Sequence, residues 1–327
     1  MNRLNRWLIR ARRLLITFAP VKAMIRKSKK IILPGFRGIP LFDVVNFFFA
    51  ELKKEGLSDR ASAIAFNLLM AIPSAIILLL TLIPYMPISN QFTNELFGLI
   101  RDIMPGEKNN HAIILFLVDL MENPRHGLLS LGFLLAVYYS SNAMQGIMRS
   151  FDKSYIGFKK RTSFGERKTA LKLTGIAFIL LFIGIILLVA QGAVLKWIIP
   201  SSVIRAIITN FRWILIILLF LSINSFIYRY APAIHKKWKL LNPGSILATF
   251  LMIVTTLIFS FYVTNFDSYN TLYGSIGTIL ILMLLIYFNA LVLLIGFELN
   301  VSITSLKRIA DDRKEAEEAK ETTETAA

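Results

Sequence analysis

The sequence contains no cysteine, only three histidines, and few charged residues for its length. Without cysteine the chain can form neither disulfides nor thiolate metal sites. The histidines, His111, His126 and His235, are far apart, and none lies in a metal-binding motif. Charged residues make up 17% of the 327 positions, whereas a soluble domain carries about 25%. This composition excludes a disulfide framework and argues against a water-soluble globular protein.

Catalytic and nucleotide-binding motifs are also missing. No G-x-x-x-x-G-K-[ST] sequence occurs, so the chain is not expected to bind a nucleotide through a P-loop. The acidic residues are scattered between apolar runs, and no set of nucleophile, base and metal ligands can be assembled from them. We therefore expect no enzyme activity, no catalytic residue, no metal and no cofactor.

Long apolar runs dominate the sequence, whose mean hydropathy is +0.61. A membrane-spanning helix needs about 20 predominantly apolar residues. Six windows qualify, at residues 63–85, 128–150, 173–195, 211–231, 245–266 and 275–299. A shorter run at 112–120 is too brief to span, and we expect an interfacial helix there. The sequence thus predicts an all-α, polytopic membrane protein with a bundle of six transmembrane helices.

The orientation of the bundle follows from where its basic residues lie. Residues 1–62, 149–172, 229–243 and 300–327 carry 14, 8, 4 and 5 Lys and Arg, whereas 86–127, 196–212 and 267–274 carry 3, 3 and none. Cytoplasmic loops hold the excess of basic residues in membrane proteins. Both termini are therefore predicted to be cytoplasmic, in a multi-pass membrane protein.

Residues outside the six windows form two further regions. Residues 1–62 predict two amphipathic helices, with apolar stripes at Leu4, Trp7, Leu8, Ala11, Leu15 and Phe18, and at Phe42, Val45, Phe49 and Leu52. Such helices suit the anionic inner-leaflet surface or packing under the bundle, and a partner-binding role is the alternative. Residues 301–327 predict a charged cytoplasmic tail, frayed or partly disordered.

Three stretches carry a family resemblance. They are Arg60-Ala-Ser-Ala-Ile-Ala-Phe-Asn67, Tyr139-Ser-Ser-Asn-Ala-Met-Gln-Gly-Ile-Met-Arg149, and Tyr273-Gly-Ser-Ile-Gly277 leading to Leu294-Ile-Gly-Phe-Glu-Leu-Asn300. With Pro243-Gly244, they resemble the YihY/virulence factor BrkB family of bacterial inner-membrane proteins over most of the chain. Phe288 beside Tyr287 departs from the Trp-x-Tyr pattern of many relatives. The resemblance implies a six-helix fold and, because some members are suspected of moving lipids or other amphiphiles, a lipid-like substrate. Members have often carried the label ribonuclease BN, which the scattered acidic residues do not support.

Polar residues inside the windows gather toward the predicted cytoplasmic ends. The candidates for a substrate-binding cavity are Asn67, Tyr138, Asn142, Gln145, Arg149, Asn224, Tyr228, Arg229, Tyr287, Glu298 and Asn300. Helical spacing places Tyr138, Asn142, Gln145 and Arg149 on one stripe, and Tyr287 and Glu298 on another. Because buried polar groups in a membrane pair or line a hydrated cavity, we expect these stripes to face inward around a polar cavity open to the cytoplasm.

Glu298 is the one carboxylate within the six windows, so a cationic partner is expected, with Arg149 and Arg229 as candidates. The alternative is purely structural: an ion pair, with the amides as interhelical hydrogen bonds worth about 0.6 kcal/mol each. Close helix packing is expected at Gly175, Gly184, Gly192 and Gly296.

Two functions follow from these patterns. The first is a transporter or flippase-like carrier of an anionic or amphiphilic substrate, and the second is a non-catalytic scaffold that organises envelope proteins. The basic loops predict weak, non-specific RNA binding at most, so membrane lipids and a small amphiphile are the expected partners, without a specific nucleic acid. The formation of a homo-oligomer is also compatible with the sequence.

Overall fold

The structure is a computed structural model, and it describes residues 26–54, 56–82, 115, 118, 126–152, 161–198, 202–234, 237–265 and 275–325. The helices of this part are α3 (Leu41–Lys54), α4 (Leu57–Leu82), α7 (His126–Phe151), α8 (Ser163–Ile198), α9 (Ser202–Tyr230), α10 (Pro243–Asn265) and α12 (Ser275–Thr325). Each of the six apolar windows falls on one of the helices from α4 to α12. The amphipathic helix expected at residues 4–18 lies outside the described residues, as does nearly all of the run at 112–120.

Helices α9, α10 and α12 are long and apolar enough to cross a membrane, among the residues that the structure describes. Their exposed surfaces carry large apolar side chains, for example Leu218, Phe250 and Leu284. Extensive exposed apolar surface marks contact with lipid or another protein rather than with water. The helices therefore support a location in a membrane.

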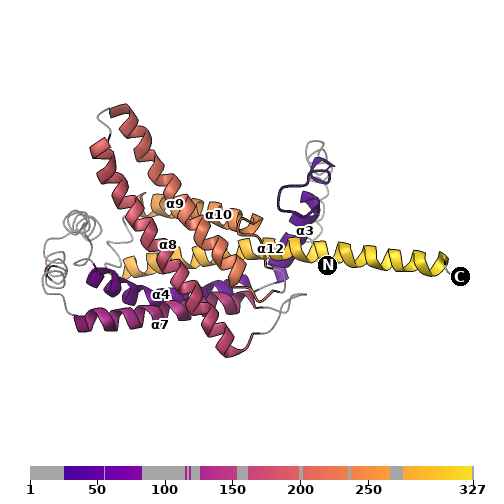
Figure 1. Cartoon of the computed structure of the whole chain (residues 1–327), viewed down its shortest axis with the longest axis horizontal. Helices are drawn as coiled ribbons and strands as arrows, with labels where there is room; N and C mark the ends of the chain where they lie inside the picture. The colour runs from indigo at the N-terminus through magenta and orange to yellow at the C-terminus, as the bar shows by residue number, and fades with distance from the viewer. Residues whose placement is uncertain are drawn as a thin grey trace, which may run out of the picture.

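The six long helices form a closed ring. Helix α4 packs against α7, α7 against α8, α8 against α9, α9 against α10, and α10 against α12, which returns to α4. Figure 1 shows α8 and α9 as a long hairpin that crosses α12. The order around the ring is the order along the chain, as expected when consecutive helices become neighbours.

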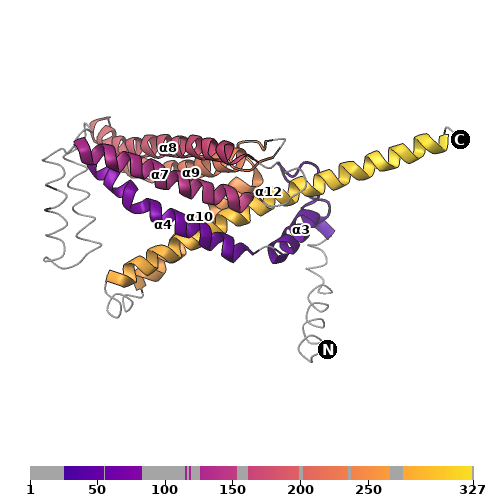
Figure 2. The same cartoon turned by 90° about the horizontal axis from the view of Figure 1, so that it is seen from below.

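The ring is packed most tightly at one end, which we call the closed end. There buried side chains come from the start of α4, the end of α7, the start of α8, the end of α9 and the middle of α12. Its centre is the buried cluster that includes Ile64, Phe151, Leu173, Tyr228 and Phe297. Helices α10 and α12 run together and diverge from α7, α8 and α9 toward the opposite end (Figure 2).

Helix α3 packs beside α12 next to the closed end. Its buried side chains are Val44 and Phe48, which contact Leu299 of α12 in a second apolar cluster. Val45 and Phe49 of the predicted stripe are instead 39% and 57% exposed. Leu52 of the same stripe packs against the cluster, so the predicted stripe overlaps only partly with the face of α3 that contacts α12.

Helix α12 is a single helix of 51 residues. At a rise of 1.5 Å per residue it is about 75 Å long, more than twice the roughly 30 Å of a hydrocarbon core. Its last part projects beyond the bundle and carries the C-terminus (Figures 1 and 2). Residues up to Thr325, where the sequence predicts a frayed or partly disordered tail, continue the helix.

Candidate functional site

A buried ion pair joins α4 to α12 at the closed end. Arg60 Nη1 donates to Glu298 Oε1 at 2.8 Å, with the two side chains 9% and 0% exposed. Arg60 Nη2 also donates to the carbonyl of Ser150 at the end of α7. Glu298 thus has the cationic partner that the cost of burying a lone carboxylate demands.

The partner is not one of the two arginines that the sequence suggested. Arg149 pairs with Glu166 of α8 at 2.9 Å, and its side chain is 69% exposed. Arg229 is half-buried and lies 5.6 Å from the centre of the Tyr230 ring. Arg60 precedes the first apolar window by three residues and was not among the predicted cationic partners.

The polar stripe of α7 contacts α8 rather than Glu298. Asn142 Oδ1 and Gln145 Oε1 accept hydrogen bonds from Arg167 Nη1 at 2.5 and 3.0 Å. The Arg167 guanidinium lies 5.2 Å from the centre of the Tyr138 ring. Tyr138 is 53% exposed, and so the prediction that this stripe faces the interior is wrong for Tyr138 and for Arg149. Arg167 was not among the predicted residues, because α8 begins ten residues before the predicted apolar window.

Helix α9 is tied to its neighbours by two buried polar side chains. Asn224 Nδ2 donates to Thr249 Oγ1 of α10 at 3.1 Å. Tyr228 Oη donates to the carbonyl of Leu293 on α12 at 2.6 Å. Both side chains are buried, and both form interhelical hydrogen bonds, as the structural alternative predicts.

Asn300 holds the start of α10 against α12. Its Oδ1 accepts the backbone N–H of Gly244 at 2.9 Å, and its Nδ2 donates to Asn242 Oδ1 at 2.6 Å. Asn242 Oδ1 also accepts the N–H of Ser245 at 2.8 Å, which satisfies another free donor at the helix start. The two helices approach each other closely at this point: a Cβ added to Gly296 of α12 would lie only 2.6 Å from the backbone oxygen of Gly244 in α10.

Asn67 and Tyr287 complete the predicted set. Asn67 Nδ2 donates to the carbonyl of Ala63 on its own helix. The same Nδ2 atom lies 2.9 Å from the position that a Cβ on Gly146 of α7 would occupy. Tyr287 Oη lies 3.0 Å from Ser58 Oγ at the start of α4. These contacts link α4 to α7 and α12.

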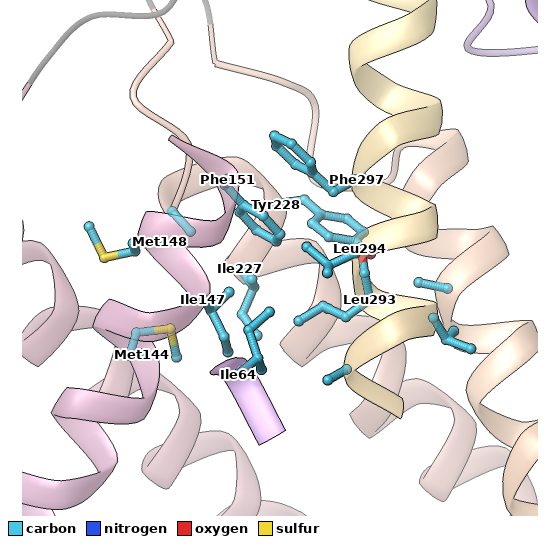
Figure 3. Packing of buried hydrophobic residues seen from close by; sticks show 14 of the residues in the cluster. Ile64, Met144, Ile147, Met148, Phe151, Ile227, Tyr228, Leu293, Leu294 and Phe297 are labelled. Atoms are coloured by element: carbon cyan, nitrogen blue, oxygen red, sulfur yellow. Dashed lines mark hydrogen bonds between the residues drawn. The ribbon is translucent and has the colours of Figure 1, made fainter. Parts of the chain in front are cut away.

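Aromatic side chains fill the middle of the closed end. Phe151 stacks on Phe297, and Tyr228 lies 5.9 Å from Phe151 between centroids (Figure 3). The Trp238 ring lies 5.8 Å from the Phe297 ring between centroids. Glu298 beside this cluster is fully buried. The predicted residues therefore do not line one shared polar cavity inside the ring, because this end of the ring is closed by apolar packing and interhelical bonds.

The helix faces that are buried at the closed end become exposed toward the opposite end. On α12, Leu294 is 0% exposed, whereas Met283, eleven residues earlier, is 42% exposed. On α9, Tyr228 is 0% exposed and Ile217 is 40% exposed at the same spacing. Residues eleven apart lie on one face of a helix. The same faces thus pass from a sealed core to an accessible apolar wall.

Helix α7 shows the same change. Met144 is 7% exposed, and Phe133, again eleven residues earlier, is 54% exposed. Helices α7, α9 and α12 therefore share one arrangement. Each contributes to the polar and aromatic seal at the closed end, and the same face of each helix is accessible and apolar farther along. Such a surface fits hydrocarbon chains rather than ions.

Comparison with known proteins relates this chain to a protein family. Residues 48–322 match the family described as Virulence factor BrkB. The protein named "Putative ribonuclease-like protein YfkH" of Bacillus subtilis (strain 168) is 30% identical over 263 residues, which are 79% of this chain and 94% of that protein. No solved structure matches the chain.

Shorter matches join the chain to a group of proteins named as membrane proteins. UPF0761 membrane protein PSHAa0171 of Pseudoalteromonas translucida (strain TAC 125) is 35% identical over 78 residues, 24% of this chain and 26% of that protein. UPF0761 membrane protein IL2447 of Idiomarina loihiensis is 36% identical over 76 residues, 23% and 27% of the two chains. The family match over most of the chain and the long match to the Bacillus subtilis relative show that this membrane protein belongs to the virulence factor BrkB family.

Proposed function

We propose that this protein is a carrier that moves an amphiphilic, lipid-like substrate with an anionic headgroup between the two leaflets of a bacterial inner membrane. Six helices span the membrane, both termini are cytoplasmic, and the closed end faces the cytoplasm. The orientation rests on the excess of Lys and Arg in the segments next to that end.

One observation carries the proposal: the buried faces of α7, α9 and α12 continue into accessible apolar surface away from the closed end. An acyl chain can lie along side chains such as Phe133, Ile217 and Met283 at little cost, because their accessible area is apolar. The structure is thus consistent with a carrier state that is open to the outer leaflet and closed to the cytoplasm.

The ion pair gives such a carrier a way to open. Separating Arg60 from Glu298 in a low-dielectric interior costs several kcal/mol unless another group replaces the partner. A phosphate or carboxylate headgroup that reaches Arg60 would replace Glu298 as the acceptor of its hydrogen bonds. Because only a substrate that binds the open state more tightly shifts the equilibrium, an anionic headgroup would couple its own binding to opening.

Reconstitution in liposomes with a headgroup-labelled anionic lipid tests the proposal. Movement of the label between leaflets is measured by the loss of its signal to a membrane-impermeant quencher. Met283→Trp places bulk on the accessible interior face and should slow movement at least fivefold. Leu282→Trp, one position along on another face of α12, is the matched control and should move lipid at the wild-type rate.

The ion pair supplies the second part of this test. Glu298→Gln should change the rate, whereas Arg149→Ala, at an exposed site, should not. Equal rates for protein-free liposomes and wild-type protein, for every anionic lipid supplied, would contradict the proposal. Wild-type rates for both Met283→Trp and Glu298→Gln would remove the interior of the ring from the mechanism.

A scaffold function is the second candidate, and the projecting part of α12 favours it. Residues 312–319 are exposed on a helix that extends beyond the bundle. Truncation after Ala310 separates the two functions. A scaffold loses its co-purifying envelope partner, whereas a carrier keeps its rate of lipid movement.

A nuclease activity is not part of the proposal. The ribonuclease-like name belongs to the Bacillus subtilis relative. Within the described part of this chain, no three His, Asp or Glu side chains gather into a group that could hold a metal ion.

A further inference from the structure

A cavity of about 220 Å³ lies outside the ring, where the loop before α3 meets the start of α10 and the middle of α12. Its ten lining residues are Gly35, Arg37, Trp238, Lys239, Leu241, Asn242, Pro243, Asn300, Ile303 and Thr304. Two lining side chains, Arg37 and Lys239, are basic, and none of the lining residues is acidic. The cavity therefore has a positive electrostatic potential.

The loop that carries Arg37 is held in an unfavourable backbone conformation. Arg37 has a φ of 53°, between Gly35 and Gly38 at 90° and 86°. Left-handed φ costs a non-glycine residue about 1 kcal/mol or more, and such conformations concentrate at functional sites. Packing enforces it: Phe36 is buried in the α3–α12 cluster, and a Cβ added to Gly35 would lie 2.8 Å from Pro243 Cγ.

The neutral polar groups around the cavity already have partners. Trp238 Nε1 donates to Thr304 Oγ1 at 3.1 Å. Asn300 and Asn242 bind each other and accept the N–H groups at the start of α10, so that helix end offers no free donor at Gly244 or Ser245. Arg37 and Lys239 differ, because neither forms an ion pair in the described part of the chain. Two uncompensated cations in one cavity attract an anion with two or more acceptor oxygens.

Apolar surface begins beside the two cations. Leu241, which lines the cavity, is 64% exposed. Ile246 and Phe250, within the first two turns of α10, are 56% and 62% exposed. An inorganic anion makes no favourable contact with such an apolar surface, whereas the acyl chains of a lipid pack against it.

We propose that this cavity binds the phosphate-bearing headgroup of an anionic glycerophospholipid, whose acyl chains lie along the exposed face of α10. Arg37 and Lys239 contact the phosphate, and Leu241 contacts the glycerol end of the chains. The site lies outside the ring and goes beyond the proposed carrier function, because a lipid bound here links α3, α10 and α12 without entering the interior.

Binding of labelled phosphatidylglycerol to the purified full-length protein in phosphatidylcholine nanodiscs tests this site. The double variant Arg37→Gln/Lys239→Gln should bind at least tenfold more weakly, because it loses two basic contacts with an anionic lipid. Lys237→Gln is the matched control. Lys237 lies over the Tyr230 ring rather than in the cavity, so this variant should bind as the wild type does.

The outcomes separate the possible ligands. Equal affinity of the double variant and the wild type overturns the proposal. Full displacement of the label by millimolar inorganic phosphate would assign the cavity to a free anion and overturn the lipid. Should the double variant unfold, Lys239→Gln alone, at an exposed side chain, decides with an expected loss of about threefold to fivefold. Lipid movement between leaflets is measured separately, so a failure here leaves the carrier proposal standing.

Discussion

Phe151 of α7 and Phe297 of α12 stack in parallel across the closed end, with ring centroids 4.1 Å apart and planes 2° apart. Both side chains are fully buried. Glu298 follows Phe297 directly, so the aromatic stack and the buried ion pair share one turn of α12. Apolar packing and a polar link thus hold the same junction, and each can be tested by itself.

Removal of the Phe297 ring should destabilise the closed end strongly. Phe297→Ala deletes a fully buried aromatic side chain, a change that costs about 3–5 kcal/mol in well-packed cores. Denaturant unfolding in detergent micelles measures it. Phe288→Ala, at a site 39% exposed on the same helix, should cost less than about 1 kcal/mol. Equal losses for the two variants would show that Phe297 is not part of a packed core.

The ion pair should behave as a strongly coupled unit. Arg60→Met and Glu298→Gln each leave a buried partner without its counter-charge, which costs about 3–5 kcal/mol. The double variant should be far more stable than the sum of the two losses predicts, as a double-mutant cycle of unfolding free energies will show. Arg149→Met is the exposed control, with an expected change below about 1 kcal/mol. Additive losses would mean that the two side chains are independent.

Two glycines predicted as packing sites should respond in opposite ways to alanine. A Cβ on Gly296 would meet Tyr228 Oη at 2.5 Å and Ala248 Cβ at 2.8 Å, so Gly296→Ala should lower the unfolding free energy by about 1–3 kcal/mol. Gly175 has no neighbour within 4 Å of such a Cβ. Gly175→Ala should therefore be neutral or should stabilise α8 by up to about 1 kcal/mol. Thermal unfolding of the matched pair checks both signs, and a larger loss at Gly175 would reject the helix packing described here.

The accessible interior can be mapped by single cysteines, because the chain has none of its own. Met283→Cys should react with a membrane-impermeant maleimide added outside intact cells, since thiolate chemistry needs water. Leu294→Cys, on the same face of α12 at the closed end, should react only after denaturation. Leu257→Cys lies at similar depth on the lipid-facing side of α10 and should stay unlabelled. Labelling of Leu257→Cys but not of Met283→Cys would contradict an interior open to the outside.

The fold could be predicted largely because the length of an apolar run is a strong signal. All six windows coincide with helices, but the helix bounds differ where polar residues extend them. Helix α8 begins at Ser163 and so includes Glu166 and Arg167, which no apolar window would contain. Of the glycines predicted as packing sites, Gly184 and Gly296 have close neighbours and Gly175 has none, while Gly192 lies outside the residues whose side-chain surroundings are described.

The candidate site was harder to predict, because spacing within one helix does not reveal its neighbours. The need of Glu298 for a cation followed from the cost of burying a charge, but Arg60 lies 238 positions away in the sequence. For α7, periodicity correctly grouped Asn142 and Gln145 on one stripe. It could not show that the stripe binds Arg167 of α8, because Met144 and Met148 on another face supply the core.

The uninterrupted length of α12 has a mechanical consequence. The stretch from Asn300 to Thr325 is about 38 Å long at 1.5 Å per residue, and it belongs to the same rigid rod as Phe297 and Glu298. A tilt of about 5° at the closed end would therefore displace the far tip of the rod by roughly 3 Å. Events inside the bundle would become movements large enough for a second protein to sense.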